Sequence, residues 1–446
     1  MVVTEVRPGS PAPRTARTAS RSGHPLAGVA AATLMLATSR WGAYIGISPF
    51  FLTDALLATG LLLVLVRRAG SAVGRRPPAS RRGSPGPVAL LLLVYVLVRF
   101  AAGRDHSLLA LRDFAPYGYV AVAFVSAGAY RRSTGRDRAL TMTVVSYALL
   151  FHLGWVCLVR LLPTLPDHLP VVNAEQDIHI FSLRGSTDLN LVGVTAAVYL
   201  GRYVRTGRWR YLMVAGIGVA LVLGLPARAA LLGTAVAIAV SLVVSFTVAA
   251  TSGAMRDRRL AAIGLLPLVL VVAALLFPTT TGGGQLLSGL GVTPVSSDLD
   301  VGGVATVQAR KAAWHLVLDY LGETHSGLFG VGFGPDFLYE SGARVPLGNS
   351  AYLRSPHNYL LGSYARLGVV GLVLLGAVTV GAARLLVVTR RLAGTEEILL
   401  FASCYAASVF TTALFGVELE APFCAVPFFW CLGVLLSRPT AAAPAG

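Results

Sequence analysis

The sequence predicts an all-α polytopic membrane protein with about twelve transmembrane helices and one large extracytoplasmic loop. The chain of 446 residues is 55% hydrophobic and only 13% charged, and its mean hydropathy is +0.70. A soluble domain carries about a quarter charged residues. Apolar runs close to the length of a bilayer span recur along the whole chain, and arginines gather between them.

The apolar runs divide the chain into twelve expected spans, several of them short or interrupted by Gly and Pro. They cover 25–47, 50–66, 87–101, 112–129, 139–162, 188–204, 211–225, 227–249, 260–277, 358–388, 396–415 and 421–437. Residues 1–24 are rich in Pro, Ser and Arg, a composition typical of disorder. The expected order is a disordered cytoplasmic N-terminus (1–24), spans one to nine (25–277), a large extracytoplasmic loop (278–356), spans ten to twelve (357–437) and a cytoplasmic tail (438–446).

The net charge of +17 is distributed in a way that predicts orientation. If the N-terminus is cytoplasmic and the spans alternate, most arginines fall in inner segments and most carboxylates fall outside. This is the positive-inside pattern of a multi-pass protein of the inner or plasma membrane, with both termini cytoplasmic. The basic balance is therefore explained by topology, and we expect no nucleic-acid partner.

Disulfide, metal and dinucleotide sites have little support in the sequence. All four cysteines lie in apolar spans, without a CxxC pair. Asp298 and Asp300 form a DxD that could bind a divalent ion with phosphate, although a solvated turn is the more ordinary interpretation. The glycines of GLFGVGFG lack a strand–loop–helix context, so we expect tight turns there. The expected site holds no metal and no cofactor.

The loop at 278–356 is too long to be a simple connection, and loops of that size are usually functional. Its segment VATVQARKAAWHLVLDYLGE predicts a helix. Helical spacing puts five of its residues on one face: Val307, Lys311, Trp314, Leu318 and Leu321.

His357 stands where this loop meets the tenth span, in SPHNYLL. Ser355 can serve as N-cap and Pro356 as the first helical residue, which places His357 and Asn358 in the first turn. The positive pole of a helix start disfavours imidazolium, so we expect a neutral His357 that can accept a proton. The alternative is a polar residue at the membrane interface, satisfied by water.

Several basic residues lie on the outer side, against the general charge bias. A cluster of guanidinium groups can grip a phosphate or diphosphate bidentately. The alternatives are ion pairs with outer carboxylates and, for Arg228 at a span end, snorkelling to the interface. The residues are Arg228, Arg310, Lys311, Arg344, Arg354 and Arg366.

Asp188 and Asn190 lie at the outer start of span six, in RGSTDLNLVG. Their side chains could bind sugar hydroxyls, and helix capping explains them equally well. The sequence leaves both interpretations open.

Taken together, RKAAW, GLFGVGFGPDF, PHNYLL and RLGVVGLVLL resemble the C-terminal domain of the O-antigen ligase and polymerase superfamily of membrane glycosyltransferases. Upstream, RGSTDLNLVGV and GLPARAALLG look like that family's Asn-containing span start and its Ser-Arg-Gly segment. The resemblance covers roughly residues 180–390. One departure is that Ala227 and Ala229 flank Arg228, where the family often has Ser and Gly.

The resemblance implies a GT-C-like helical fold and a function in cell-surface polysaccharide assembly. The implied reaction is an inverting, metal-independent transfer from a polyprenyl-diphosphate-linked glycan to a hydroxyl of a glycan or glycolipid acceptor on the outer face. The catalytic residues implied are His357, Arg310 and Arg228. The substrate-binding residues that we expect around them are Arg354, Lys311, Asn358, Asn190 and Arg344.

Other functions stay open on the sequence alone. A polysaccharide polymerase of the same superfamily would use the same donor and motifs. A transporter or flippase for lipid-linked glycan belongs to a different class and would favour charges in mid-span, whereas the cations here gather at span ends and in the loop. A scaffold protein would leave the outer arginines unexplained.

Overall fold

A computed structural model describes residues 33–34, 38–47, 50–72, 86–103, 105–174, 177–183, 185–225, 227–249, 298–349 and 353–437. The described chain is mostly helical with few strands. Four of its helices are long and apolar enough to cross a membrane: Leu108–Arg132, Gly135–Leu161, Arg228–Phe246 and Tyr359–Leu385. The prediction of a helical protein with the composition of a membrane protein is confirmed. The count of twelve spans and the GT-C-like arrangement stay predictions.

Most expected spans in the described ranges coincide with a helix. The helices are α3 (Leu52–Ala72), α4 (Gly86–Ala101), α5 (Leu108–Gly118), α6 (Val120–Arg132), α7 (Gly135–Leu161), α8 (Gly185–Thr206), α9 (Trp209–Gly224), α10 (Arg228–Ala249), α15 (Tyr359–Thr395), α16 (Glu397–Ala413) and α17 (Pro422–Leu436). Local capping fixes several starts. In α7, Thr134 and Asp137 form a reciprocal capping box.

The first and ninth expected spans do not coincide with a described helix. Span nine (260–277), residues 1–32 and residues 35–37 lie outside the described residues. The expectation of a continuous helix to residue 47 is wrong: α2 is only Arg40–Ala43, and strand β1 (Gly46–Ile47) pairs antiparallel with β2 (Phe50–Phe51). The helix ends at Ala43 with Tyr44 as its C-cap, and Gly46, at φ +146, already lies in the strand.

The core centres on the last two helices. Nearly every residue of α17 is buried, and α17 packs against α6 and α16. A second group of helices, α7 to α10, packs beside α16, and α10 lies against α8 over small residues. For example, a Cβ on Gly233 would lie 2.8 Å from Asn190 Oδ1. Close approach through small residues is how membrane helices commonly associate.

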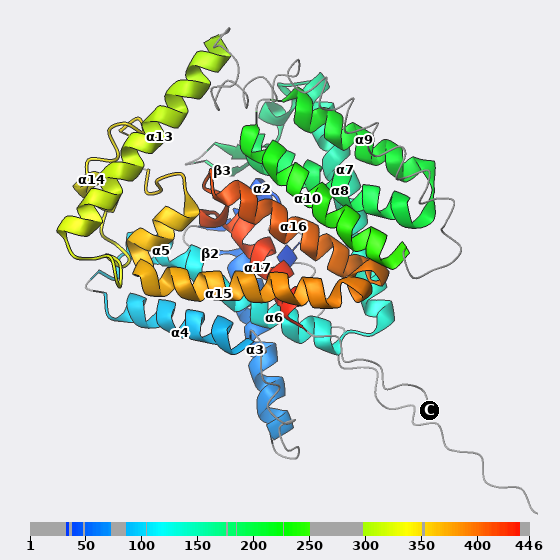
Figure 1. The fold of residues 1–446 in the computed structure, drawn as a ribbon, viewed down its shortest axis with the longest axis horizontal. Coiled ribbons are helices and arrows are strands. Elements are labelled where there is room, and N and C mark those ends of the chain that lie inside the picture. Colours follow the sequence, from blue (N-terminus) through cyan, green and yellow to red (C-terminus); the bar gives the residue numbers. More distant parts are fainter. Residues whose placement is uncertain are drawn as a thin grey trace, which may run out of the picture.

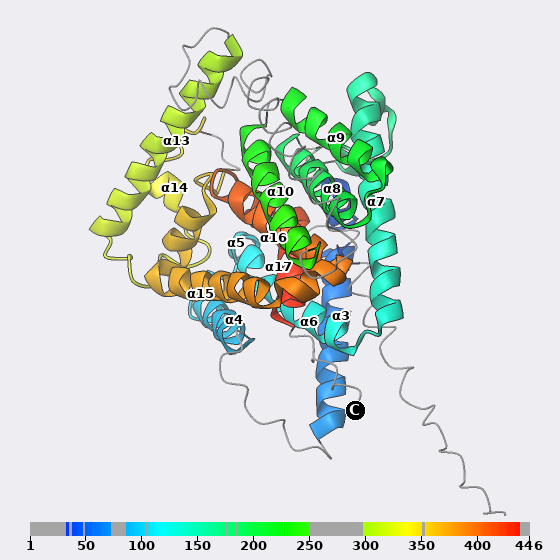
Figure 2. The ribbon, with the colours of Figure 1, turned by 45° about the vertical axis from the view of Figure 1, so that its right-hand side comes forward.

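Outside this core, the expected loop contributes α13 (Asp298–Glu323) and α14 (Phe337–Glu340). Both views place α13 and α14 at one edge of the molecule, with α7 and α9 at the other (Figure 1 and Figure 2). A short hairpin of β3 (Val171–Asn173) and β4 (Ile178–His179), with the 3-10 helix η1 (Leu165–His168) before it, connects α7 to α8. The connection between α16 and α17 contains the 3-10 helix η4 (Glu418–Glu420).

Helix α15 is broken near its start. Gly368 has φ +66 and ψ −170, so the helical ladder stops there and resumes at the next residue. The glycine-rich turn 327–332 fills the break. The N–H groups of Val369 and Val370 donate to the carbonyls of Gly327 and Leu328.

On the other side of the break, the carbonyls of Ala365 and Arg366 accept from Val331 and Gly332. The carbonyl of Leu367 accepts from the Tyr95 hydroxyl at 2.7 Å. The turn thus replaces the hydrogen bonds that the break removes, as unwound backbone in a membrane bundle requires. The prediction of tight turns in GLFGVGFG is confirmed, and the turns carry positive φ at Gly330 and Gly332.

Candidate functional site

The loop helix α13 forms one wall of the candidate site. The helix that the sequence predicted here is confirmed. Its predicted face is only partly right, because the buried stripe is Ala313, Val317 and Leu321, whereas Leu318 is 46% exposed and Lys311 is exposed. The stripe packs on Phe337 and Leu338 of α14, which turns α13 so that Arg310 and Trp314 lie on a half-buried flank.

Two side chains on successive turns of α13 join it to distant parts of the chain. The Trp314 indole N–H donates to the carbonyl of Pro356 at 2.7 Å, next to His357. Arg310 Nη1 donates to the carbonyl of Phe415 at 2.7 Å, just after α16. The loop helix is therefore fixed at two points, one beside the expected histidine and one beside the connection to α17.

A pair of guanidinium groups lies at this second point. Arg228 begins α10, and it interacts electrostatically with Arg310, as does Glu418 of η4. Burial and the neighbouring Arg228 lower the pKa of Arg310, and Glu418 acts in the opposite direction. Two guanidinium groups therefore lie close together, with the buried carboxyl group of Glu418 beside Arg310, and guanidinium groups are suited to binding an anionic ligand.

The turn that carries His357 differs from the expectation in its register. Helix α15 begins at Tyr359, and Asn358 caps it, since Asn358 Oδ1 accepts the N–H of Leu361 at 3.1 Å. Ser355 is not the N-cap: its Oγ accepts the N–H of His357 at 3.1 Å. His357 itself is left-handed, with φ +54. It therefore precedes the first turn, and the argument from first-turn N–H groups for a neutral imidazole does not apply.

The left-handed conformation of His357 is informative in itself. A non-glycine residue held at positive φ costs on the order of 1–3 kcal/mol and persists only where its surroundings fix it. Here the Ser355 hydroxyl and the Trp314 indole hold the turn on both sides of the residue. The half-buried imidazole is thus carried by a rigid turn between α13 and α15.

Three of the arginines that the sequence analysis expects on the outer side form ion pairs instead of an open cluster. Buried Asp113 of α5 accepts two bonds from Arg354, of which Nε to Oδ1 is 3.0 Å, and one from Arg366 Nη1 at 2.8 Å. Asp336 pairs with Arg344 and Arg354. Ion pairing was the alternative interpretation of these residues. Substrate binding by Arg344 and Arg354 stays a prediction that would require these pairs to open.

Asn190 lies inside the helix bundle. It is buried in α8 and accepts a hydrogen bond from the Ser408 hydroxyl of α16. Its neighbour Asp188 is buried too and lies 3.4 Å from His152 Nε2. The structure thus gives both side chains partners within the protein. Arg228 and Arg310 lie close together. His357 follows Pro356, whose carbonyl bonds to Trp314, one turn after Arg310 on the same helix. Lys311 of α13 is exposed.

Sequence reasoning did not single out the residues of the α16–α17 connection. Phe415 supplies a carbonyl to Arg310, and Glu418 and Glu420 place two carboxyl groups beside the outer cations. A signal was present, because GVELE sets two acidic residues in a very short connection between apolar spans. Ionisable groups in such positions are costly and often functional.

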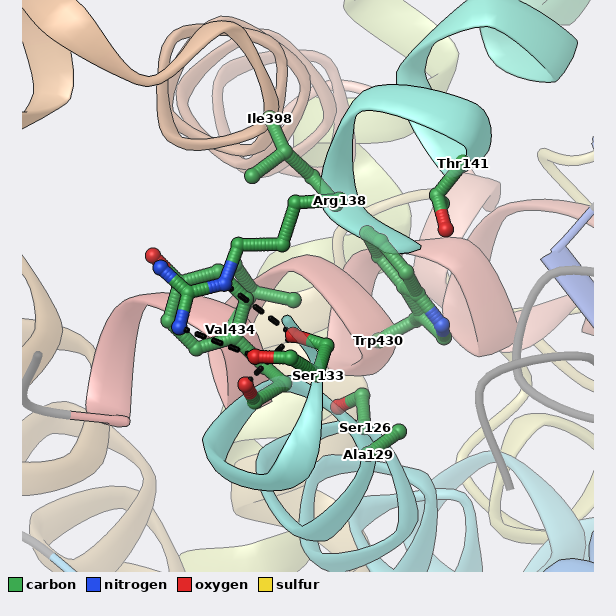
Figure 3. Close-up of a pocket in the computed structure, with 9 residues that line it drawn as sticks. Ser126, Ala129, Ser133, Arg138, Thr141, Ile398, Trp430 and Val434 are labelled. Atoms are coloured by element: carbon green, nitrogen blue, oxygen red, sulfur yellow. Dashed lines mark hydrogen bonds between the residues drawn. The ribbon is translucent and has the colours of Figure 1, made fainter. Parts of the chain in front are cut away.

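A metal centre finds no support within the described ranges, where no group of three or more His, Cys, Asp or Glu residues could hold an ion. Asp298 and Asp300 open α13 in helical conformation, so the solvated turn expected for them is wrong. At the opposite end of the helices lies a small pocket of about 20 Å³, room for about one water molecule. It is lined by Ser133, Arg138 and Trp430 among others, with Arg138 hydrogen-bonded to Ser133 (Figure 3).

Arg138 also pairs with Glu396 at 2.7 Å, so this pocket contains no excess charge from that pair.

Comparison with known proteins finds no family model and no curated protein that matches the chain. Function is therefore inferred from the chemistry of the site, which contains two guanidinium groups, a histidine on a rigid turn, and two carboxyl groups near them.

Proposed function

We propose that the protein is a membrane glycosyltransferase that transfers a glycan from a polyprenyl-diphosphate-linked donor to a hydroxyl of an acceptor glycan or glycolipid on the outer face. The observation that carries the proposal is that Arg228, at the start of α10, interacts with Arg310 of the loop helix, which in turn bonds to Phe415. The resemblance of these stretches to O-antigen ligases and polymerases supplies the substrate class.

The two guanidinium groups supply what a diphosphate leaving group needs. As the bond between the anomeric carbon and the phosphate oxygen breaks, negative charge grows on the diphosphate. Arg228 and Arg310 stabilise that charge, and they do so more strongly in a half-buried site than in water. The donor is already activated by its lipid diphosphate, so the reaction needs neither ATP nor a nucleotide sugar.

His357 is the proposed proton acceptor. Its imidazole takes the proton of the acceptor hydroxyl, whose oxygen attacks the anomeric carbon opposite the diphosphate and inverts that centre. The Trp314–Pro356 bond links the turn of His357 to the helix that carries Arg310. That link supports a single site in which the base and the anion-binding groups keep a fixed spacing.

Reconstitution of the purified protein with total lipid-linked glycan from the host tests the function. Loss of the lipid with transfer of the glycan to a new acceptor would support a ligase. A ladder of longer lipid-linked products would support a polymerase of the same superfamily. Movement of intact lipid-linked glycan across the vesicle without transfer would contradict both and favour a transporter.

His357→Ala should reduce the transfer rate about a hundred- to ten-thousandfold, the usual range for general acid–base catalysis. His357→Gln should be nearly as inactive, because glutamine keeps a polar side chain but cannot accept the proton. His315→Ala, at an exposed histidine of α13, is the matched control and should stay active. If glutamine restores most of the rate, His357 only positions the acceptor.

A further inference from the structure

Glu420 is the most unusual carboxyl group at the candidate site. Its Oε1 atom is buried and has no hydrogen-bond partner among the described residues. It lies against the first turn of α15, where a Cβ on Gly362 would be 2.9 Å from Oε1 and 3.5 Å from Pro356 Cδ. A larger residue at this position would force the carboxyl group to move.

Two more buried oxygen atoms near Glu420 lack partners in the described part of the chain, Tyr359 Oη and Ser363 Oγ. Each of these hydroxyl groups carries one O–H donor and can also accept, whereas a carboxylate offers only acceptors. An ionised Glu420 can accept from such a hydroxyl, and a protonated Glu420 can donate to one. The polar atoms of this site can therefore accommodate the carboxyl group with or without a proton.

The charged groups that face Glu420 come from three elements. The pKa of Glu420 is raised to about 7, mainly by burial; the Ser355 hydroxyl and Arg366 of α15 act to lower it, and Asp113 of α5 and Glu418 of η4 act to raise it. The tyrosines Tyr117 and Tyr359 also interact with it. The carboxyl group thus changes its protonation near neutral pH, where a proton-transfer group works best.

Glu420 is linked to the turn of His357 through Ser355. The Ser355 hydroxyl interacts with the Glu420 carboxyl and accepts the N–H of His357. We infer that Glu420 is the proton-holding residue of this site, the carboxyl group to which the acceptor's proton passes from His357. The inference rests on the proposed transfer function and adds to it the residue that takes the proton from His357 and so returns the imidazole to its neutral form.

The step balances without another reactant. The acceptor O–H bond breaks and its proton moves to the imidazole, while the acceptor oxygen forms a bond with the anomeric carbon. The bond between that carbon and the diphosphate oxygen breaks, and its electron pair leaves with the diphosphate. The imidazolium then gives its proton to the Glu420 carboxylate, which regenerates neutral His357 and later releases the proton to water.

The test is the pH dependence of transfer in reconstituted vesicles, for the wild type and for Glu420→Gln. We expect the wild-type rate to fall as the pH drops through about 7. Glu420→Gln should lose about tenfold or more in rate and show no such fall between about pH 6 and pH 8. Glu323→Gln, at an exposed carboxyl group at the end of α13, is the control and should keep the wild-type profile.

A second variant protects the test against misfolding of the first. Gly362→Ala keeps the carboxyl group but pushes its Oε1 away, and it should move the acid limb of the profile. Gly376→Ala lies in the same helix with nothing within 4 Å of the added Cβ, and it should not. Wild-type transfer with a profile that neither variant changes in shape overturns the role of Glu420. No transfer by the wild type with any lipid-linked glycan overturns the proposed function and, with it, the inference.

Discussion

Two groups of arginines lie at the loop end of the bundle, and their surroundings differ. Arg354 and Arg366 share Asp113, and their side chains are only 9% and 5% exposed. Arg228 and Arg310 are half-buried, and Arg310 interacts with both Arg228 and Glu418. In the first group each arginine pairs with a carboxylate, whereas in the second two like charges lie side by side. The same residue type therefore serves as a structural clamp in one place and as a candidate anion site in the other.

The comparison teaches that charge balance, more than residue type, separates structure from function here. A buried ion pair holds elements in place, and its removal leaves an uncompensated charge. A pair of like charges is unfavourable until an anion joins it, which is a property of a binding site. The variants below test whether the two groups separate in this way.

The largest effect is expected at the like-charged pair. Arg228→Ala and Arg310→Ala should each lower the transfer rate about a hundredfold or more, because they remove stabilisation of the developing diphosphate charge. The thermal stability of the purified protein should fall by no more than the loss of one hydrogen bond, such as that from Arg310 to Phe415, explains. Arg310→Lys should recover only part of the rate, since a point charge lacks the bidentate fork.

Gln308→Ala, at an exposed position of the same helix, is the control for Arg310 and should behave as wild type. Equal and full activity of Arg310→Ala and Arg310→Lys would assign Arg310 to packing and would remove the contrast between the two groups.

The next effect concerns stability at the paired group. Asp113→Ala leaves Arg354 and Arg366 buried without the carboxylate that they share, and this should cost about 3–5 kcal/mol in the free energy of unfolding. Asp319→Ala, at an exposed carboxylate of α13, should change it by less than about 0.5 kcal/mol. Denaturant titration in detergent measures both. A small effect of Asp113→Ala would mean that the clamp does not hold the loop.

A smaller effect is expected at Glu420, and its sign depends on pH. A folded pKa of about 7 lies above the ordinary glutamate value of about 4.3. The folded state therefore holds its proton more tightly, and this carboxyl group destabilises the fold as the pH rises from about 4 to about 7. Glu420→Gln should remove that penalty of about 4 kcal/mol at most.

The measurement for Glu420 is the melting temperature of wild type and variant across this pH range. The variant should gain on the wild type as the pH rises, with no gain at about pH 4. A gain that is the same at every pH would reflect packing and would contradict the raised pKa of the carboxyl group.

The smallest effect compares two glycines with similar backbone angles. Gly330 and Gly342 have φ +71 and +74, but only Gly330 lies against the backbone of Arg366. Gly342→Ala should cost about 1 kcal/mol in the free energy of unfolding from the conformation alone. Gly330→Ala should cost more, because its Cβ would push the turn out of the break in α15. Equal costs would show that the turn can shift without loss.

The helices and their approximate ends followed from apolar run length, which depends on local composition and is readable from the sequence. The loop helix and the tight turns of GLFGVGFG were predictable for the same reason. The break at Gly368 was not, because RLGVVGLVLL reads as an uninterrupted apolar helix. The interruption depends on a turn some forty residues earlier, and no local pattern encodes that contact.

At the site too, local sequence features could be predicted, whereas contacts between distant residues could not. Arg228, Arg310 and His357 could be singled out as unusual outer residues, but their neighbours could not. Phe415 contributes a backbone carbonyl, which any residue has. The partner that neutralises Arg354 and Arg366 lies more than two hundred positions away, at Asp113. The start of α15 was misplaced because Ser-Pro favours a helix start as strongly as the Asn358 cap does.

The turn in the break of α15 also imposes an order on biosynthesis. Residues 327–332 leave the ribosome before Gly368, and in the folded protein the two halves of the helix close around them. A chain that ends before Val370 would offer the Leu328 carbonyl without its donor. The break in α15 is therefore bridged only when both the turn and the segment after Gly368 have been synthesised. Completion of this helix is thus a late step in the protein's own assembly.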